Sequence, residues 1–478
     1  MYEYGYLSGG EWIDHGKRFE THNPARPGER AGRYTATPPE AVAGMVRAAD
    51  VAQRDWGARP PVERSRQVQR FLDAVEARAE AIAVAVTREQ GKPLAEARGE
   101  TGKSLREARF MAGEAARPHS EVMPGQRPGM RNLVLRRPRG VIAAVTPWNF
   151  PVLTPMRKIA PALTFGNAIV LKPSEFTPAA AAIIAEAALE TLPPGLLQLL
   201  HGGAGAGTAL VSDPGVHGVT FTGSVATGRR IYAAAAANLA EVSLELGGKN
   251  AVVINDSDDL DGCLDQVVGA ANQCAGQRCT AISRVIVRED LRDDVLRGLV
   301  ARAEAERLGD GAVDGTTMGP LTNRDQLERV DAYVREGLEA GARALTGGRR
   351  AQVSGCEDGF FFEPTVLADV TPQMSVAREE IFGPVLSVLT YRDFDEALTI
   401  LNGVEYGLTS ALFSNDNHLV QRFLDHSQNG MMHVNHGTVP DDHMPFGGIR
   451  HSGVGAYSVG RSAVTFYTTE HSAYLRHA

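Results

Sequence analysis

The chain has 478 residues but only four cysteines, which form neither a disulfide framework nor a zinc motif. No Cys-x-x-Cys pair or Cys/His cluster occurs, so no metal site is expected. No apolar run reaches the roughly 18 residues that a membrane span requires. The N-terminal residues lack the basic-then-apolar pattern of a secretory signal. We therefore expect a cytoplasmic protein with reduced thiols and no membrane association.

The sequence also lacks a run of lysines and arginines. Its 49 basic and 57 acidic residues leave a net charge of −8. This balance argues against nucleic acid or an anionic membrane as the main partner. It is compatible with a small anionic ligand, because a local basic pocket does not show in the net charge.

The remaining composition is that of a folded α/β protein, with 43% hydrophobic and 22% charged residues. The length indicates two or more domains. Apolar residues at helical spacing predict helices over 38–56, 61–91 and 100–116. Residues 118–141 contain turn residues between β-type stretches and predict strands that project from the helical body.

From residue 141 onward, short apolar runs alternate with helical patterns, which predicts βαβ units and a parallel sheet. In such a sheet a nucleotide binds at the carboxyl ends of the strands. One of these helices follows Thr177, which is expected to cap it. Residues 250–450 repeat the pattern and indicate a second α/β domain.

Two glycine-rich stretches follow apolar runs. Residues 203–207 resemble a dinucleotide fingerprint but lack its spacing, so a glycine-rich turn is the favoured interpretation. Residues 221–228, FTGSVATG, end an apolar run and open a helix. Gly223 permits close approach, and Ser224 with the helix amides suits a pyrophosphate. An ordinary strand–helix turn is the alternative.

Four other stretches carry residue types that could do chemistry. Asn149 lies in a proline-bracketed loop and could hydrogen-bond an oxyanion. Glu245 lies in an apolar strand, where a carboxylate is costly unless it is paired or functional. Lys172 and Glu175 follow a strand, where a carboxylate can bind ribose. Cys279 could be a nucleophile, a metal ligand, half of a disulfide or a small buried residue, and taken singly each of these residues could equally be structural.

Taken together, the motifs resemble those of the aldehyde dehydrogenase superfamily in order and spacing, from about residue 20 to the C-terminus. The motifs are TPWNFP (146–151), LKPSE (171–175), FTGS (221–224), LELGGKN (244–250), GQRCTA (276–281), EEIFGPV (379–385) and MPFGG (444–448). The resemblance implies an α/β fold with a Rossmann-like cofactor domain, an α/β catalytic domain and a small β oligomerisation arm. The corresponding segments are 1–117 with 138–247, then 248–451, then 118–137 with 452–478. A homodimer or homotetramer is expected.

The resemblance also implies the catalytic roles. Cys279 is the nucleophile that forms a thiohemiacetal and then a thioester. Asn149 and the Cys279 backbone N–H hold the oxyanion. Glu245 activates the water that releases the acid. Related enzymes that pass the acyl group to coenzyme A lack this glutamate, so hydrolysis is expected here. Cys274 has no matching role and is expected to be structural.

The cofactor implied is NAD, with NADP as a second acceptor. Glu175 would repel a 2′-phosphate. Glu380 is expected to bind the nicotinamide ribose, with Phe382 nearby. The full set of cofactor-binding residues is Thr146, Pro147, Trp148, Asn149, Lys172, Pro173, Ser174, Glu175, Phe221, Gly223, Ser224, Leu246, Glu380 and Phe382.

Basic residues near the implied substrate tunnel favour an anionic aldehyde. Arg157 and Arg278 align with tunnel positions, and guanidinium groups recognise carboxylates in bidentate fashion. Lys103 or Arg106 would add a third charge. Succinate semialdehyde is the first choice and 2-oxoglutarate semialdehyde the next. The substrate-binding residues expected are Arg157, Arg278, Phe150, His443 and Phe446.

Two alternatives stay open. The substrate could be a neutral aliphatic or aromatic aldehyde, with the arginines paired internally, or the chain could be a catalytically silent relative.

The sequence departs from the family pattern at one place: Ala456-Tyr457 replace an Arg-Glu pair thought to relay protons. Tyrosine cannot accept a proton as a carboxylate can, so water or Lys158 would serve the relay, or it is dispensable.

Overall fold

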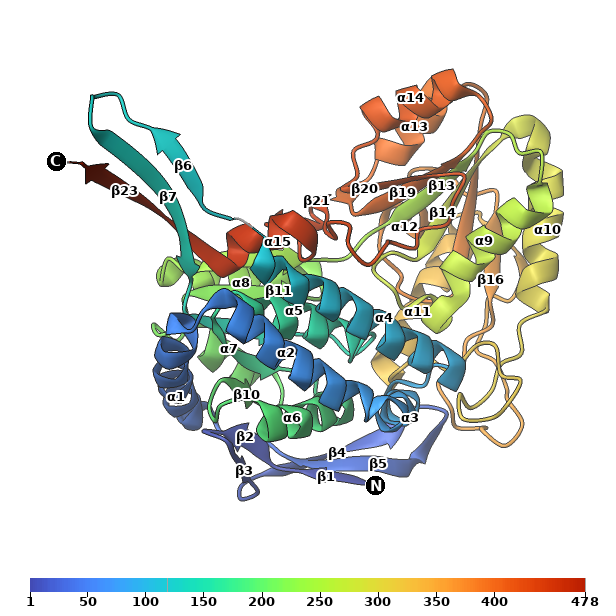
Figure 1. The fold of residues 1–478 in the computed structure, drawn as a ribbon. Helices are drawn as coiled ribbons and strands as arrows, with labels where there is room; N and C mark the ends of the chain where they lie inside the picture. Colours follow the sequence, from blue (N-terminus) through green and yellow to red (C-terminus); the bar gives the residue numbers. More distant parts are fainter. Residues whose placement is uncertain (118, 478) are drawn as a thin grey trace.

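Short apolar strands build an eight-stranded sheet in the part of the molecule that carries the predicted cofactor motifs (Figure 1). The computed structural model describes residues 1–117 and 119–477; Pro118 and Ala478, each at an end of a predicted arm segment, lie outside the described residues. The strand order is β22-β12-β11-β8-β9-β10-β2-β3. The strands are β2 (Tyr6–Ser8), β3 (Glu11–Ile13), β8 (Val141–Val145), β9 (Ala168–Lys172), β10 (Leu197–Leu199), β11 (Gly218–Thr222), β12 (Glu241–Glu245) and β22 (Gly453–Gly455).

The five central strands of this sheet, from β12 to β10, are parallel, as the alternating pattern predicted. Every residue of β9, β10 and β11 is buried, because helices cover both faces. The helices of this body are α1 (Pro39–Ala58), α2 (Pro61–Glu76), α3 (Ala79–Gln90), α4 (Leu94–Gly113), α5 (Leu153–Thr164), α6 (Ala179–Thr191), α7 (Ala204–Val211) and α8 (Val225–Ala237). A three-stranded sheet, β1 (Tyr2–Tyr4), β5 (Arg26–Thr35) and β4 (Arg18–Asn23), lies beside it.

The single helix predicted over 61–91 is wrong: the chain breaks at Ala77 and Arg78 into α2 and α3. Both pieces keep an apolar stripe, but their partners differ. Helix α2 packs on α5 and α6, whereas α3 packs on α6 and on the strands β4 and β5. The helix predicted to begin at residue 100 begins instead at Leu94, directly after Pro93. Periodicity reports a buried face and does not report a change of direction between two helices.

The predicted Thr177 cap is also wrong. Helix α6 begins at Ala179, and its amide donates to Glu89 Oε2 (2.9 Å) from helix α3. The Thr177 hydroxyl instead donates to the Trp148 carbonyl (3.3 Å). A buried carboxylate 90 residues away therefore satisfies the helix end.

A second, seven-stranded sheet has the order β15-β16-β17-β14-β13-β19-β20, and all its strands except β15 are parallel. Its strands are β13 (Asn250–Ile254), β14 (Ile282–Arg288), β15 (Arg343–Thr346), β16 (Thr365–Ala368), β17 (Val385–Tyr391), β19 (Thr409–Phe413) and β20 (Met431–Val434). Its helices are α9 (Leu260–Asn272), α10 (Arg292–Glu304), α11 (Arg324–Glu339), α12 (Ser375–Arg378), α13 (Phe394–Asn402) and α14 (Asn417–His426). Separate apolar clusters fill the two faces of this sheet, so it has its own core.

Three strands project from the body as an arm (Figure 1): β6 (Glu121–Pro124), β7 (Met130–Pro138) and β23 (Thr468–Arg476), in the order β23-β7-β6. The C-terminal segment contributes more than the arm, because β22 joins the first sheet and α15 (Gly460–Tyr467) packs on α5. A short pair of β18 (Tyr406–Gly407) and β21 (Ile449–Arg450) completes the strands. The single-turn helices are η1 (Glu114–Ala116), η2 (Gln273–Gly276) and η3 (Glu289–Leu291). A search of the described residues finds no helix with the length and hydropathy to cross a membrane.

Candidate active site

A cavity of about 440 Å³ lies between the two bodies, lined by residues of both. It contains the three predicted catalytic residues, Cys279, Glu245 and Asn149. Other predicted site residues also line it: Pro147, Trp148, Phe150, Arg157, Gly223, Ser224, Leu246, Arg278, Glu380, Phe382 and Phe446. The sequence reasoning missed several lining residues, among them Lys92, Glu96, Glu100, Thr222 and Gln273.

Cys279 lies between η2 and β14 and is partly exposed in the cavity. The chain reaches it through an unusual turn, in which Cys274, Ala275 and Gly276 all have left-handed backbone angles. Two of these residues carry a Cβ, and each such residue costs about 1–2 kcal/mol. Strain of this kind concentrates at functional sites. The amide of Asn250 holds the Cys279 carbonyl at 2.7 Å and so fixes the residue.

Burial, with a smaller contribution from the neighbouring Glu245 carboxylate, raises the pKa of Cys279 to about 12. Arg157 and Arg278 act in the opposite direction. The resting residue is therefore a thiol at neutral pH. Because the thiolate is the nucleophile, a base in the cavity has to accept this proton when substrate arrives.

Glu245 ends strand β12 and points into the cavity. One carboxylate oxygen accepts a hydrogen bond from the Thr222 hydroxyl (3.2 Å). The other, Oε1, is buried and has no hydrogen-bond partner among the described residues. A buried oxygen without a donor is costly, so this atom is available for a proton, a water molecule or a substrate group.

The orientation of the Asn149 amide is set by one contact. Its Nδ2 donates to the Gln277 carbonyl (2.8 Å), two residues before Cys279. An amide nitrogen has two donors, so the second remains for a bound group. The donor required for an oxyanion is therefore present on a buried side chain in the same cavity.

Several predicted cofactor residues lie at one end of the cavity. The Trp148 and Phe382 rings meet edge to face at 5.4 Å between centroids. Glu380 accepts a hydrogen bond from the Gly248 amide (3.0 Å), and burial raises its pKa. Phe382 has a positive φ of 62°, a conformation supported by Gln326, whose amide donates to the Phe382 carbonyl at 2.7 Å.

Two features of this region suit a dinucleotide: a carboxylate packed against a glycine backbone, and an exposed helix N-terminus. A Cβ at Gly247 would lie 2.2 Å from Glu380 Oε2, so only glycine lets this carboxylate sit against the backbone. Ser224 is the N-cap of α8, and its hydroxyl accepts the Thr227 amide at 3.3 Å. An exposed helix N-terminus beside Gly223 suits a pyrophosphate, and Glu380 suits ribose hydroxyls.

The predicted adenosine end lies outside the lining of this cavity. Lys172 Nζ donates to the Pro173 carbonyl (3.0 Å) and lies 3.7 Å from Glu175. The remaining predicted residues here are Thr146, Ser174 and Phe221, all buried. The 203–207 glycines, predicted to form a turn, instead open helix α7 with Gly203 at its N-cap. A Cβ on Gly203 would lie 3.5 Å from Glu175 Oε1, so this stretch borders the predicted ribose site.

Arg157 does not present a free guanidinium to the cavity. Its Nε and Nη2 both bind Glu107 at 2.8 Å, in a buried bidentate pair, and the Phe446 ring lies 4.1 Å from its Cζ. This geometry argues against the predicted role of Arg157 as a substrate anchor. Lys103 and Arg106 are likewise occupied, because both bind Asp442 (2.8 and 2.6 Å).

Arg278 is different. It is buried, and its hydrogen bonds go only to neutral groups: Gln273 Oε1 (2.5 Å) and Thr280 Oγ1 (3.2 Å). Among the described residues Arg278 forms no salt bridge within 4.0 Å, and burial lowers its pKa. Three of its five N–H donors are unused. The Glu96 carboxylate in the same cavity acts on Arg278 electrostatically but does not contact it, so the guanidinium has no direct ion pair, and a substrate carboxylate could supply one.

Of the remaining predicted substrate residues, two line the cavity and one does not. Phe150 and Phe446 line the cavity. His443 does not; it is exposed and packs edge to face with Phe110 at 6.0 Å. Among the described residues Glu245 accepts no hydrogen bond from Tyr457, which stands where relatives have the relay glutamate; the Tyr457 side chain lies against Gly447 and Gly430. Lys158 is buried and donates to the Thr220 hydroxyl (2.9 Å), and burial lowers its pKa to about 8.

Comparison with known proteins agrees with this geometry. The model of the Aldehyde dehydrogenase family matches residues 12–472. A betaine aldehyde dehydrogenase of Cereibacter sphaeroides is 38% identical over 95% of the chain and 92% of its own length. The mitochondrial succinate-semialdehyde dehydrogenase of Arabidopsis thaliana is 36% identical (94% and 85%). An alpha-ketoglutaric semialdehyde dehydrogenase of Bacillus subtilis is 34% identical (98% and 97%).

Solved structures agree on the fold. An NAD-dependent aldehyde dehydrogenase from Sinorhizobium meliloti superposes with a TM-score of 0.96 at 34% identity, covering 99% of this chain and 95% of that one. An NADP-dependent enzyme of E. coli gives 0.96 at 31% identity, covering 100% and 98%. The chain belongs to the aldehyde dehydrogenase family. It has the aldehyde dehydrogenase fold and is an NAD(P)-dependent enzyme that acts on aldehydes.

Proposed function

We propose that the protein oxidises a small anionic aldehyde, such as succinate semialdehyde, to the free acid with NAD. The observation that carries the substrate class is Arg278, a buried guanidinium in the cavity wall next to Cys279 with only neutral partners. A carboxylate at the far end of a short aldehyde could bind its unused donors while the aldehyde carbon reaches the thiol. Two relatives named for acidic semialdehydes support the same class.

In the proposed mechanism the Cys279 thiol loses its proton to the free oxygen of Glu245, and the thiolate attacks the aldehyde carbon. The second Asn149 N–H and the Cys279 backbone amide stabilise the oxyanion of the thiohemiacetal. A dinucleotide held by Ser224, Glu380 and Phe382 would supply the hydride acceptor, and loss of hydride from the thiohemiacetal would leave a thioester on Cys279. Glu245 passes this first proton to solvent and then takes a proton from water, which attacks the thioester carbon; the bond from that carbon to Cys279 Sγ breaks, and the acid leaves.

The preference for NAD over NADP is proposed from Glu175. Its carboxylate lies beside Lys172 and Gly203, in the region predicted to hold the adenine ribose. A carboxylate binds ribose hydroxyls and repels a 2′-phosphate. Lys172 would offset part of this repulsion, so we expect NAD to be preferred without NADP being excluded.

We also propose that the arm joins subunits into a dimer or tetramer. It exposes Val122 and Met123 on β6 and Tyr474 on β23, which is 74% exposed in the single chain. Exposed apolar side chains on open strands favour association. Light scattering on a size-exclusion column tests this assembly.

For the other two predicted domains, we propose that the first sheet, with residues 1–117 and 138–247, binds the cofactor. The body formed by 248–451 would carry Cys279.

The test of the function is NADH formation across a panel of aldehydes. It runs from acetaldehyde and benzaldehyde to betaine aldehyde and to succinate, glutarate and 2-oxoglutarate semialdehydes, with NAD and NADP compared. The highest kcat/KM for an acidic semialdehyde supports the proposal. A preference for betaine aldehyde or a neutral aldehyde would reject the anionic substrate. NADH formation that survives Cys279→Ala would reject the proposed nucleophile.

A further inference from the structure

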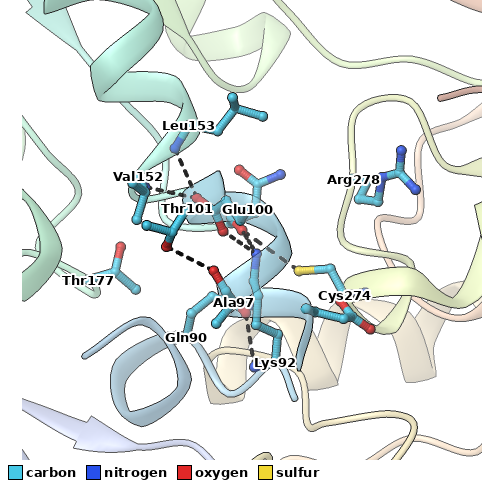
Figure 2. Close-up of polar contacts among 12 residues, drawn as sticks. Gln90, Lys92, Ala97, Glu100, Thr101, Val152, Leu153, Thr177, Cys274 and Arg278 are labelled. Atoms are coloured by element: carbon cyan, nitrogen blue, oxygen red, sulfur yellow. Dashed lines mark hydrogen bonds and ion pairs between the residues drawn. The ribbon is translucent and has the colours of Figure 1, made fainter. Parts of the chain in front are cut away.

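Lys92 is a buried cation that the catalytic scheme does not use. It lies between α3 and α4, in the wall of the cavity, and is 2% exposed. Its ammonium group donates to Glu100 Oε2 at 2.7 Å (Figure 2). It also donates to the backbone carbonyl of Asn149 (2.8 Å) and lies 4.0 Å from the centroid of the Phe150 ring. A buried ion pair is weak evidence for a stabilising role, so its contacts have to be explained individually.

The partner of Lys92 holds the beginning of helix α5. Glu100 Oε1 accepts the amides of Val152 (2.8 Å) and Leu153 (3.0 Å), the first of this helix (Figure 2). A carboxylate at a helix N-terminus satisfies unpaired amides and complements the helix dipole. Lys92 and Glu100 therefore hold the chain on both sides of Phe150, one at the Asn149 carbonyl and the other at the α5 amides.

The Asn149 side chain and carbonyl are also held by residues 274–277, which directly precede Arg278 and Cys279. Its amide donates to the Gln277 carbonyl at 2.8 Å, and the Cys274 thiol donates weakly to the Asn149 carbonyl at 3.7 Å. Gln277 is connected back to the Lys92 segment, because its Oε1 accepts the Thr322 amide (2.9 Å) and the Thr322 hydroxyl accepts Gln90 Nε2 (3.0 Å). The Asn149 backbone and side chain are thus held by separate elements.

We propose that Lys92, together with Glu100, is a positioning residue for the oxyanion donor Asn149. This inference rests on the proposed function, in which the free N–H of Asn149 binds the oxyanion. The Lys92 ammonium fixes the backbone from which that amide projects. A displacement of about 1 Å at such a donor can cost roughly a hundredfold in rate. Lys92 touches neither substrate nor cofactor in this scheme and acts only through Asn149.

The test compares Glu100→Gln with the double variant Lys92→Met/Glu100→Gln. Both remove the buried anion, so neither leaves it unpaired, and glutamine can still accept an α5 amide. Only the double variant lacks the donor to Asn149. With the aldehyde that the wild-type enzyme oxidises fastest, we expect the rate of NADH formation in the first turnover to be about 10- to 100-fold lower in the double variant than in Glu100→Gln. The KM for NAD should change by less than about threefold.

A double-mutant cycle separates positioning from a general structural role. In an Asn149→Ala background, loss of Lys92 should change the first-turnover rate by less than about threefold, because the donor it positions is gone. An equal effect in both backgrounds would overturn the inference. Tyr391→Phe, which removes a buried hydrogen bond to Asn255 outside the cavity, is the matched control and should leave this rate unchanged.

The cycle also distinguishes the two proposals. If Asn149→Ala itself leaves the rate unchanged, the oxyanion role in the proposed function fails, and the role of Lys92 fails with it. If Asn149→Ala lowers the rate and Lys92 acts additively, only the inference about Lys92 fails. Rates are normalised to active sites by titration of Cys279, so partial unfolding of a variant does not imitate the effect.

Discussion

Replacing Arg278 by methionine should remove discrimination in favour of acidic aldehydes. Two of its N–H groups bind Gln273 and Thr280, and three are unused. A charge-assisted hydrogen bond to a substrate carboxylate contributes about 1.5–3 kcal/mol. At about 1.36 kcal/mol per tenfold, that corresponds to a loss of roughly 10- to 150-fold in kcat/KM for an acidic substrate.

The assay compares succinate semialdehyde with butanal, which has the same chain length and no charge. The quantity to measure is the ratio of the two kcat/KM values, because Arg278 also lowers the pKa of Cys279 and its loss slows both reactions. Arg278→Lys keeps the charge without the bidentate geometry and should give an intermediate ratio. An unchanged ratio in Arg278→Met would refute the assignment of Arg278 to the substrate.

Arg157→Met is the contrasting variant. It would leave the buried Glu107 carboxylate with only the longer contact to Lys103 (3.5 Å), so the cost should stay below the about 3–5 kcal/mol of a fully unpaired buried charge. We expect a lower melting temperature and slower turnover of both aldehydes, with the ratio preserved. A selective loss of the acidic substrate in this variant would restore the role predicted for Arg157 and contradict the one inferred from its ion pair.

Three further changes have defined outcomes. Glu245→Gln should lower both the first-turnover rate of NADH formation in stopped-flow measurements and the steady-state turnover by about 100-fold or more, because the Cys279 thiol and the hydrolytic water both lose their base; an NADH burst at the wild-type rate would show that Glu245 does not deprotonate Cys279. Gly276→Ala should lower the melting temperature and the activity, since its φ is +69° and its Cβ would lie 2.2 Å from the Gly383 carbonyl oxygen; an unchanged melting temperature would contradict this. Burial raises the pKa of Glu89 to about 7. The folded state therefore binds this proton more tightly than the unfolded state, and the resulting stabilisation is complete below pH 4.5 and lost as the pH rises through 7. The stability of the wild type relative to Glu89→Gln should thus fall by about 1–3 kcal/mol between roughly pH 5 and 8 in thermal melts, and parallel pH profiles would show that the pKa is not raised.

Much of the fold could be predicted because it depends on local pattern. The apolar runs from β8 to β12 are buried strands of a parallel sheet, and the turn-rich segment before residue 141 is the projecting arm. Where the prediction failed, distant contacts decided the outcome. The first amide of α6 donates to Glu89, which lies far away in the sequence. The chain changes direction between α2 and α3 because α3 packs on the strands β4 and β5.

The candidate site was also predictable from sequence only in part. Motif order placed Cys279, Glu245 and Asn149 in one cavity without structural information. The Lys92–Glu100 pair was missed because Lys92 directly follows the helix predicted over 61–91 and was assigned no role in the site, and Glu100 was only the start of the next predicted helix. A signal was available: Glu100, Ser104 and Glu107 are spaced by four and three residues on the buried face of α4, where apolar residues are expected.

The sequence by itself determined the alternation of strands and helices and supplied the candidates for nucleophile and base, because strand and helix patterns and the order of the motifs can be recognised along the chain. Only the tertiary structure decided which charges are available for function. Arg157 and Arg278 are indistinguishable as sequence, yet one is paired with Glu107, 50 residues away, and the other has only neutral partners. A buried charge acts on a substrate only when no protein group neutralises it, and that depends on which side chains folding brings within a few ångströms.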